Sequence, residues 1–238
     1  LKNKAGDTNI YEARRAGAVN RETAFALKHF GFAEPPLITT VTPQIKDTEV
    51  QKQGGIDAET SLFEAWSVMR ETKTDTLSIT DGNDNLLGLI ATKDIANANL
   101  DIFDIEVLGS SKTKYANIVS TLNGQMILGD PEARVMSGSL RVGTTPEMME
   151  DTVKAGDLVL VTNRYETQQF AVGSDASCIV VCCGAHVSNQ VRESAERHGC
   201  TIIATPYDTY AAARLICMSI PVRAKMIPEK NTIKFSVN

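Results

Sequence analysis

The 238 residues contain no apolar run close to the roughly 18–20 residues that a transmembrane helix needs. They also contain no secretory signal peptide. Lys and Arg number 24 and Asp and Glu number 29, which gives a net charge of −5. This mildly acidic balance argues against a dedicated DNA-binding protein. We therefore expect neither a membrane nor a nucleic acid among the partners of this protein.

Residues for metal binding and hydrolysis are also scarce. There are three histidines, no pair of them has helical metal-ligand spacing, and no Cys-x-x-Cys motif occurs. The sequence lacks a Gly-x-Ser-x-Gly motif and the Gly-Lys-Ser/Thr ending of a P-loop. We therefore predict no catalytic residue and no metal ligand in this chain.

The five cysteines lie in the last third of the chain, in apolar surroundings, and their number is odd. This pattern favours free thiols in a reducing cytoplasm over a disulfide framework. The main interpretation is that they are buried core thiols, and a redox or metal role is the alternative. These cysteines are Cys178, Cys182, Cys183, Cys200 and Cys217.

The overall composition is that of a globular protein, with 42% hydrophobic and 22% charged residues. A chain of this size buries roughly 70% of its unfolded surface. Its first residue is Leu1 rather than Met, so we expect a piece of a longer protein. Near the start, Asn20 is placed to cap a helix over residues 21–30.

Residues 36–100 have the order strand, helix, hairpin, helix. Ser61 and Glu64 form a capping box in front of the apolar helix face Leu62, Ala65, Trp66 and Met69. Two short strands around the turn at residues 81–85 then predict a hairpin, and a helix begins near Asp94.

From residue 140 onward, short apolar strands alternate with helices, one of which opens at Pro146 and closes at Gly156. Continuously apolar strands between helices predict a parallel sheet covered on both faces. The predicted fold class is therefore α/β and α+β, with a small mixed domain followed by a parallel-sheet α/β domain.

Two stretches stand where a strand meets a helix and where free amides can hold a phosphate. In Gly88–Asp94, the Asp94 carboxylate can accept two ribose hydroxyls, and Thr92 and Lys93 can contact a phosphate; the alternative is that Thr92 or Asp94 only caps the helix. In Gly184–Ser188, an anion site competes with a tight turn followed by a serine cap.

These stretches also carry a resemblance to known domains. The segment Asp57–Leu62, the hairpin and Gly88–Asp94 resemble a CBS domain. The segments Val159–Arg164, Cys183–His186 and Ala204–Thr209 resemble the DRTGG domain. Residues 219–228 resemble the entry to a second CBS domain, and residues 1–33 resemble the early DHH domain of a family II inorganic pyrophosphatase.

This order is that of the nucleotide-regulated, manganese- or cobalt-dependent pyrophosphatases. The resemblance implies a partial DHH domain at 1–35, a CBS domain at 36–100, a linker at 101–114, a DRTGG domain at 115–218 and a truncated second CBS domain at 219–238. It implies a regulatory segment of an enzyme that hydrolyses diphosphate to two phosphates. The alternative is a stand-alone nucleotide-sensing or dimerisation module without catalytic activity.

The resemblance further implies adenine nucleotides as ligands, namely AMP, ADP, ATP or a diadenosine polyphosphate, and a cytoplasmic homodimer. It implies no cofactor in this chain, with Mn or Co, together with Mg, in the parent enzyme. The implied nucleotide-binding residues are Ile56, Thr74, Thr76, Thr92, Lys93 and Asp94.

We predict that this chain hydrolyses no pyrophosphate, even with manganese or cobalt present. The reason is that the His-x-x-x-x-Asp-x-Asp and Asp-His-His motifs, which supply the metal ligands in the resembling family, do not occur in its sequence. The test is phosphate release from pyrophosphate. Release that stays above a protein-free control through successive purification steps would contradict the prediction.

Overall fold

The computed structural model describes residues 13–38, 54–100 and 106–231. They fall into two compact units, one holding residues 13–38 and the other residues 54–231. In the first unit, α1 (Arg21–His29) is capped as predicted, since the Asn20 side chain accepts the amide of Thr23 at 2.8 Å. No residue of α1 is buried.

The second unit contains two sheets, and we call the parts built on them the first lobe (residues 54–100) and the second lobe (residues 106–217). The first lobe holds β1 (Ile56–Asp57), α2 (Leu62–Thr72), β2 (Thr76–Thr80), β3 (Leu86–Ala91) and α3 (Thr92–Leu100). Its sheet has the order β1-β2-β3-β9, where β9 (Ile227–Pro228) comes from much later in the chain. The predicted hairpin is confirmed, because β2 and β3 pair antiparallel.

The helix α2 begins as predicted, with the Ser61 hydroxyl accepting the amide of Glu64 at 3.1 Å. Its apolar face is only partly as predicted. Leu62, Ala65 and Met69 are buried, whereas Trp66 is 37% exposed. Trp66 is less buried because it lines a cavity together with residues of α3.

The second lobe holds a five-stranded sheet of order β4-β8-β7-β6-β5. The strands β5 to β8 are parallel, and β4 pairs antiparallel with β8. Its strands are β4 (Gln125–Leu128), β5 (Leu140–Val142), β6 (Leu158–Val161), β7 (Cys178–Val181) and β8 (Thr201–Ala204). Its helices are α4 (Val107–Ser110), α5 (Tyr115–Thr121), α6 (Pro146–Met149), α7 (Tyr165–Gly173), α8 (Asn189–His198) and α9 (Thr209–Cys217).

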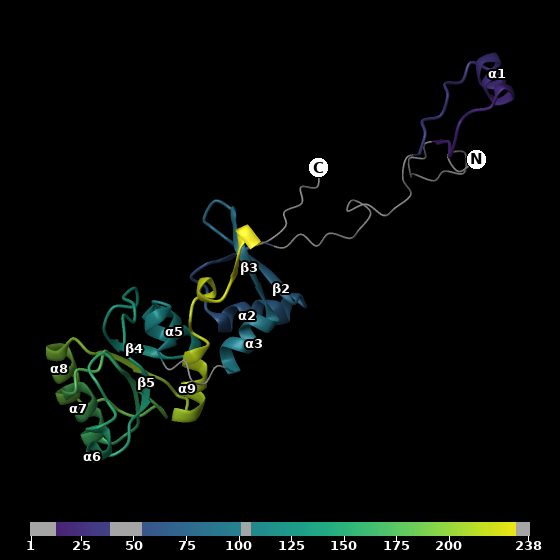
Figure 1. The fold of residues 1–238 in the computed structure, drawn as a ribbon. Coiled ribbons are helices and arrows are strands. Elements are labelled where there is room, and N and C mark those ends of the chain that lie inside the picture. The colour runs from purple at the N-terminus through teal and green to yellow at the C-terminus, as the bar shows by residue number, and fades with distance from the viewer. Residues whose placement is uncertain (1–12, 39–53, 101–105, 232–238) are drawn as a thin grey trace. The chain divides into compact units, whose positions relative to one another are not determined.

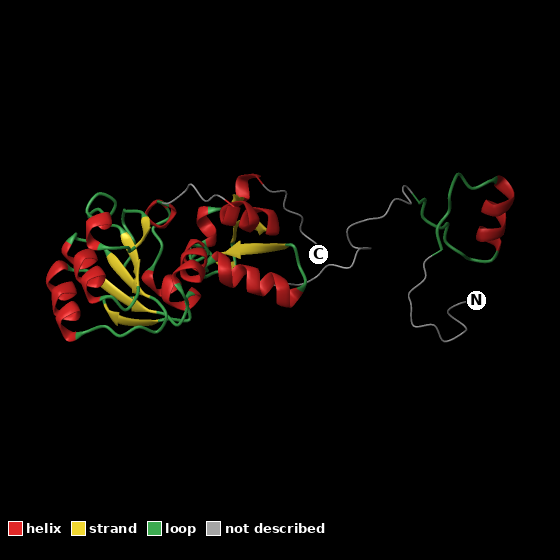
Figure 2. Cartoon of the chain, turned by 90° about the horizontal axis from the view of Figure 1, so that it is seen from below, coloured by secondary structure: helices red, strands yellow, loops and turns green. Residues whose placement is uncertain are grey.

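Helices cover both faces of this sheet, with α6, α7 and α8 on one side and α5 and α9 on the other (Figures 1 and 2). The predicted parallel sheet is therefore confirmed, and with it the mixed α/β fold class. The helix predicted from Pro146 to Gly156 begins at the expected residue but is shorter than predicted, because α6 ends at Met149. The sequence reading also missed α5 and β4.

The return segment, residues 218–228, leads from α9 back to the first lobe. The amides of Leu62 and Phe63, at the start of α2, donate to the carbonyls of Ile220 and Met218 at 3.0 and 2.9 Å. Farther along, β9 pairs antiparallel with β3. The start of a second CBS domain at 219–238 stays a prediction, and residues 232–238 lie outside the described part of the chain.

One apolar core joins the two lobes. It includes Leu62, Met69 and Ile90 from the first lobe, and Ile118 and Ile216 from the second. A second core lies between the large sheet and α6, α7 and α8. In the described ranges 13–38, 54–100 and 106–231, no helix has the length and apolarity to cross a membrane.

The cysteines follow the predicted core placement only in part. Cys178, Cys182 and Cys200 are buried, Cys217 is half-buried and Cys183 is exposed. Burial raises the pKa of Cys182 and that of Cys200 to about 12, and it also raises the pKa of Cys178. These three thiols are therefore both inaccessible and protonated at neutral pH.

We predict that Cys183 reacts first with a thiol reagent at pH 8, and that Cys178, Cys182 and Cys200 react only when the protein unfolds. The measurement is the time course of labelling with and without denaturant, and Cys183→Ser is the control that should remove the fast phase. Fast labelling of the three buried thiols in the native protein would contradict this interpretation.

Candidate functional site

The candidate site is the junction where β3 runs directly into α3. The Asp94 side chain turns back on this junction, and its Oδ2 accepts the amide of Ala91 at 2.9 Å. This bond satisfies one of the free amides at the start of the helix. The capping role that the sequence left open is therefore present. It uses one of the two carboxylate oxygens, so it does not by itself exclude a ligand role for the other.

Thr92 is half-buried and fixed by its neighbours. Its amide donates to the Asp75 carbonyl at 2.9 Å, and its hydroxyl lies 3.3 Å from the same oxygen. The hydroxyl is also 3.7 Å from the sulfur of Met69. Thr92 thus ties the start of α3 to the loop before β2, and its hydroxyl is directed into the protein. Lys93, in contrast, is exposed.

The structure gathers five of the six predicted nucleotide-binding residues at one end of the first sheet. Thr76 pairs with Ala91 across the hairpin. Thr74 lies just before it in the chain, and its hydroxyl is 2.9 Å from that of Thr72. The junction residues Thr92, Lys93 and Asp94 follow Ala91 directly.

Ile56 is the residue that lies apart. It is half-buried in β1 and pairs with Ile79 on the far side of β2 from β3. Ile79 is three residues along β2 from Thr76, a distance of about 10 Å in a strand. A contact to Ile56 therefore requires a ligand that extends across the sheet.

A cavity of about 280 Å³ lies beside the junction, between α2 and α3. Thr92 is the one predicted residue in its lining, which also includes Trp66, Ile95, Ala96, Asn99 and Met218. Sequence reasoning did not assign Trp66 and Met218 to a cavity. Met218 comes from the return segment, more than one hundred residues later, so no local pattern could have placed it there.

In the second stretch that the sequence suggested for an anion, Gly184–Ser188, carbonyls of the protein accept the first two amides, those of Gly184 and Ala185. The amide of Cys183 donates to the Tyr207 carbonyl at 2.7 Å, and that of Gly184 to the Thr205 carbonyl at 2.9 Å. The Ser188 hydroxyl accepts the amide of Val191 at 3.3 Å and caps α8. The tight turn with a serine cap is therefore the arrangement that the structure shows.

Metal binding finds no support in the described residues. Within residues 13–38, 54–100 and 106–231, no group of three or more His, Cys, Asp or Glu side chains is arranged to hold a metal ion. The described residues therefore offer no ligand set for the manganese or cobalt of the enzymes that the sequence resembles, and we derive no chemical step through a metal from them.

Comparison with known proteins identifies one domain and two relatives. Residues 117–219 match the DRTGG domain family. The chain is 32% identical over 223 residues to the cobalt-dependent inorganic pyrophosphatase of Clostridium perfringens, which covers 93% of the chain and 40% of that protein. It is 23% identical over 234 residues to a probable manganese-dependent inorganic pyrophosphatase of Thermotoga maritima, covering 98% of the chain and 42% of that protein. The chain thus spans about two-fifths of the length of these relatives.

A solved structure resembles the chain as well. It is the crystal structure of the CBS and DRTGG domains of the regulatory region of Clostridium perfringens pyrophosphatase, complexed with the activator diadenosine tetraphosphate. The TM-score is 0.74 at 29% identity, and the match covers 80% of this chain and 84% of that one.

Proposed function

Because the chain contains a DRTGG domain and is homologous over nearly its whole length to cobalt- and manganese-dependent inorganic pyrophosphatases, we propose that it is the adenine-nucleotide-binding regulatory segment of such an enzyme. The observation that carries this proposal is the similarity to a regulatory region that binds diadenosine tetraphosphate. In the intact enzyme, diphosphate and water would give two phosphates, with Mn or Co and Mg in the catalytic part. AMP, ADP, ATP and diadenosine polyphosphates are the ligands proposed for this segment.

The proposed nucleotide site is the end of the first sheet that carries Thr74, Thr76 and the β3–α3 junction. The Asp94 carboxylate receives the ribose hydroxyls, and the exposed Lys93 ammonium attracts the phosphates through a screened charge. Ile56 would be reached only by a ligand that crosses the sheet. A nucleotide bound here changes the activity only as far as it prefers one conformation of the protein over another.

We further propose a homodimer in the cytoplasm. Two exposed apolar side chains on α2 support the dimer, since Phe63 is 38% and Trp66 is 37% exposed. The edge strand β5 offers a second surface, with Val142 53% exposed at its end. No disulfide joins the cysteines of the described residues, which is consistent with a reducing compartment.

We predict that Asp94→Ala weakens the binding of AMP and ATP about tenfold to a hundredfold, because a hydrogen bond to a charged group is worth about 1.5–3 kcal/mol. Lys93→Ala is the matched control, since its side chain is exposed and its charge is screened, and it should change the affinity much less. The measurement is calorimetric titration of each nucleotide into the full-length protein and its variants.

If Asp94 only caps the helix, a different result is expected, and the same protein samples distinguish the two cases. Loss of the cap alone lowers the melting temperature of Asp94→Ala and leaves the nucleotide affinity unchanged. Equal affinities in the wild type and in a folded Asp94→Ala protein would therefore remove Asp94 from the nucleotide site and leave it as a helix cap.

For the dimer, we predict that light scattering gives twice the mass of one chain, and that Trp66→Lys shifts the protein toward monomer at low concentration. The physical reason is that a charge at Trp66 would have to be desolvated at a paired apolar surface. Glu71→Lys is the control, since Glu71 is exposed on another side of α2. A wild type that stays monomeric at high concentration would contradict the dimer.

A further inference from the structure

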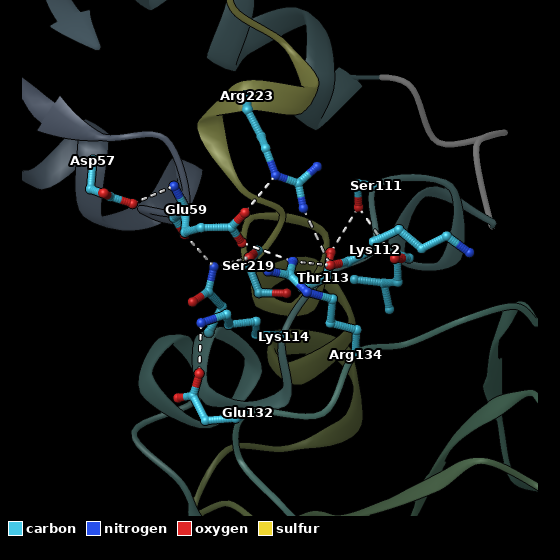
Figure 3. A network of polar contacts seen from close by, with 12 residues as sticks. Asp57, Glu59, Ser111, Lys112, Thr113, Lys114, Glu132, Arg134, Ser219 and Arg223 are labelled. Carbon is cyan, nitrogen blue, oxygen red and sulfur yellow. Dashed lines mark hydrogen bonds and ion pairs between the residues drawn. The ribbon is translucent and has the colours of Figure 1, made fainter. Parts of the chain in front are cut away.

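A polar junction joins the two lobes around a single carboxylate, that of Glu59 (Figure 3). Its Oε1 accepts from Nε of Arg223 at 2.7 Å, and its Oε2 accepts from Nη1 of Arg134 at 2.9 Å. Both guanidinium groups also donate to the carbonyl of Lys112, at 2.8 Å from Arg134 and 3.4 Å from Arg223. The two arginines therefore share the same two acceptors.

The members of this junction come from three distant parts of the chain. Glu59 lies in the loop between β1 and α2, 75 residues before Arg134 of the second lobe and 164 residues before Arg223 of the return segment. Asn117 of α5 links the same parts, since its side-chain amide donates to the carbonyls of Glu59 and Ser219 at 2.9 and 3.2 Å. The junction thus joins the first lobe, the second lobe and the return segment at one place.

This arrangement differs from an ordinary surface ion pair, which contributes little to stability. The three charged side chains are each about one-third exposed, at 33% for Glu59, 31% for Arg134 and 30% for Arg223. Burial raises the pKa of Glu59, but the hydrogen bonds and charges of Arg223 and Arg134 outweigh it and hold the pKa below its usual value. Both carboxylate oxygens are engaged, so removal of the charge weakens the link of Glu59 to both arginines at once.

The return segment connects this junction to the proposed nucleotide site. From Arg223 it continues into β9, where Ile227 and Pro228 pair with Leu89 and Gly88 of β3. Two residues after Leu89, β3 ends at Ala91 and α3 begins. Any movement of β3 that a ligand causes therefore acts on the segment that Arg223 anchors to Glu59.

We propose that Glu59 is a positioning residue whose paired bonds to Arg134 and Arg223 couple the two lobes, so that they unfold together and a ligand bound to the first lobe also stabilises the second. The lobes also share an apolar core, and the junction adds a polar link to it; this coupling of unfolding does not depend on the proposed nucleotide binding. The ligand response rests in addition on the proposed nucleotide binding.

Two probes in the 238-residue chain report on the lobes separately. Trp66 is the single tryptophan, and its fluorescence follows the first lobe. The buried thiol of Cys200 follows the second lobe, because it lies in the core between the large sheet and α6, α7 and α8 and becomes reactive when that core opens. In a urea titration, coincident midpoints of the two probes mean that the lobes unfold as one unit.

We expect coincident midpoints in the wild type and midpoints separated by about 0.5–1 M urea in Glu59→Gln. The matched control is Glu132→Gln, which removes the exposed ion pair with Lys114, 2.7 Å long, within the second lobe. This control should leave the two midpoints together. Coincident midpoints in Glu59→Gln, or an equal separation in Glu132→Gln, would overturn the coupling.

Arg134→Gln and Arg223→Gln keep the proposal testable if Glu59→Gln does not fold. Each variant removes one of the two ion pairs with Glu59, so each should separate the urea midpoints of the two probes less than Glu59→Gln does. If both arginines act through the Glu59 carboxylate, adding either arginine substitution to Glu59→Gln should increase the separation of the urea midpoints only slightly. Coincident midpoints in both single arginine variants, or additive effects on top of Glu59→Gln, would count against the junction.

Saturating AMP then tests the ligand response. It should raise both midpoints in the wild type and only the Trp66 midpoint in Glu59→Gln. If AMP raises both midpoints equally in Glu59→Gln, the ligand response does not pass through this junction and that part of the proposal fails. If AMP changes neither midpoint in the wild type, the proposed nucleotide function and the ligand response fail, and the titrations without AMP still decide whether Glu59 couples the lobes.

Discussion

The first amides of α2 donate to carbonyls of the return segment directly after α9, and this backbone contact fixes the start of the first lobe's main helix against the second lobe. The amides of Leu62 and Phe63 have no partners within their own helix, and the carbonyls of Ile220 and Met218 supply them. The bond from Phe63 to Met218, which is the C-cap of α9, also brings the positive end of the α2 dipole to the negative end of the α9 dipole, which is the favourable order. Because these amides are engaged by the protein, the start of α2 is not free to bind an anion. The nucleotide site that we propose therefore lies at the other helix start of the lobe, that of α3.

Features that depend on neighbours in the sequence could be predicted from the sequence. The Ser61 cap, the hairpin around residues 81–85 and the alternating strands and helices of the second lobe each rest on contacts within a few residues. Features that depend on distant pairing could not be predicted. The strand β4 forms by pairing with β8, which lies more than seventy residues later in the chain. The two-residue strand β9 is likewise defined as a strand only by its pairing with β3. The predicted helix from Pro146 to Gly156 had a correct start, whereas its early end at Met149 was not signalled by a local breaker.

The candidate site divides in the same way. A strand followed directly by a helix, with Asp94 in the first turn, could be recognised from spacing alone. Whether the carboxylate caps the helix or also binds a ribose could not be decided, because both roles use the same residue type at the same position. The structure adds the capping bond to Ala91 and the direction of the Thr92 hydroxyl, which lies against Asp75 and Met69. The exposed edge position of Trp66 and its neighbour Met218 required the folded chain, since the return segment brings them together.

The charge state of Glu59 determines whether a change of pH can weaken the junction between the lobes. Its pKa is lowered from the ordinary value of 4.5 by Arg223 and Arg134, despite the opposing effect of burial. A carboxylate with a lowered pKa contributes its full stabilisation above the unfolded value, and this stabilisation is lost as the pH falls through the folded value. The ion pairs are therefore complete at neutral pH, and moderate changes around neutrality leave them intact. A signal that loosens or tightens this junction near pH 7 has to come through the backbone to which it is tied, and the pairing of β9 with β3 is the route that leads to the proposed nucleotide site.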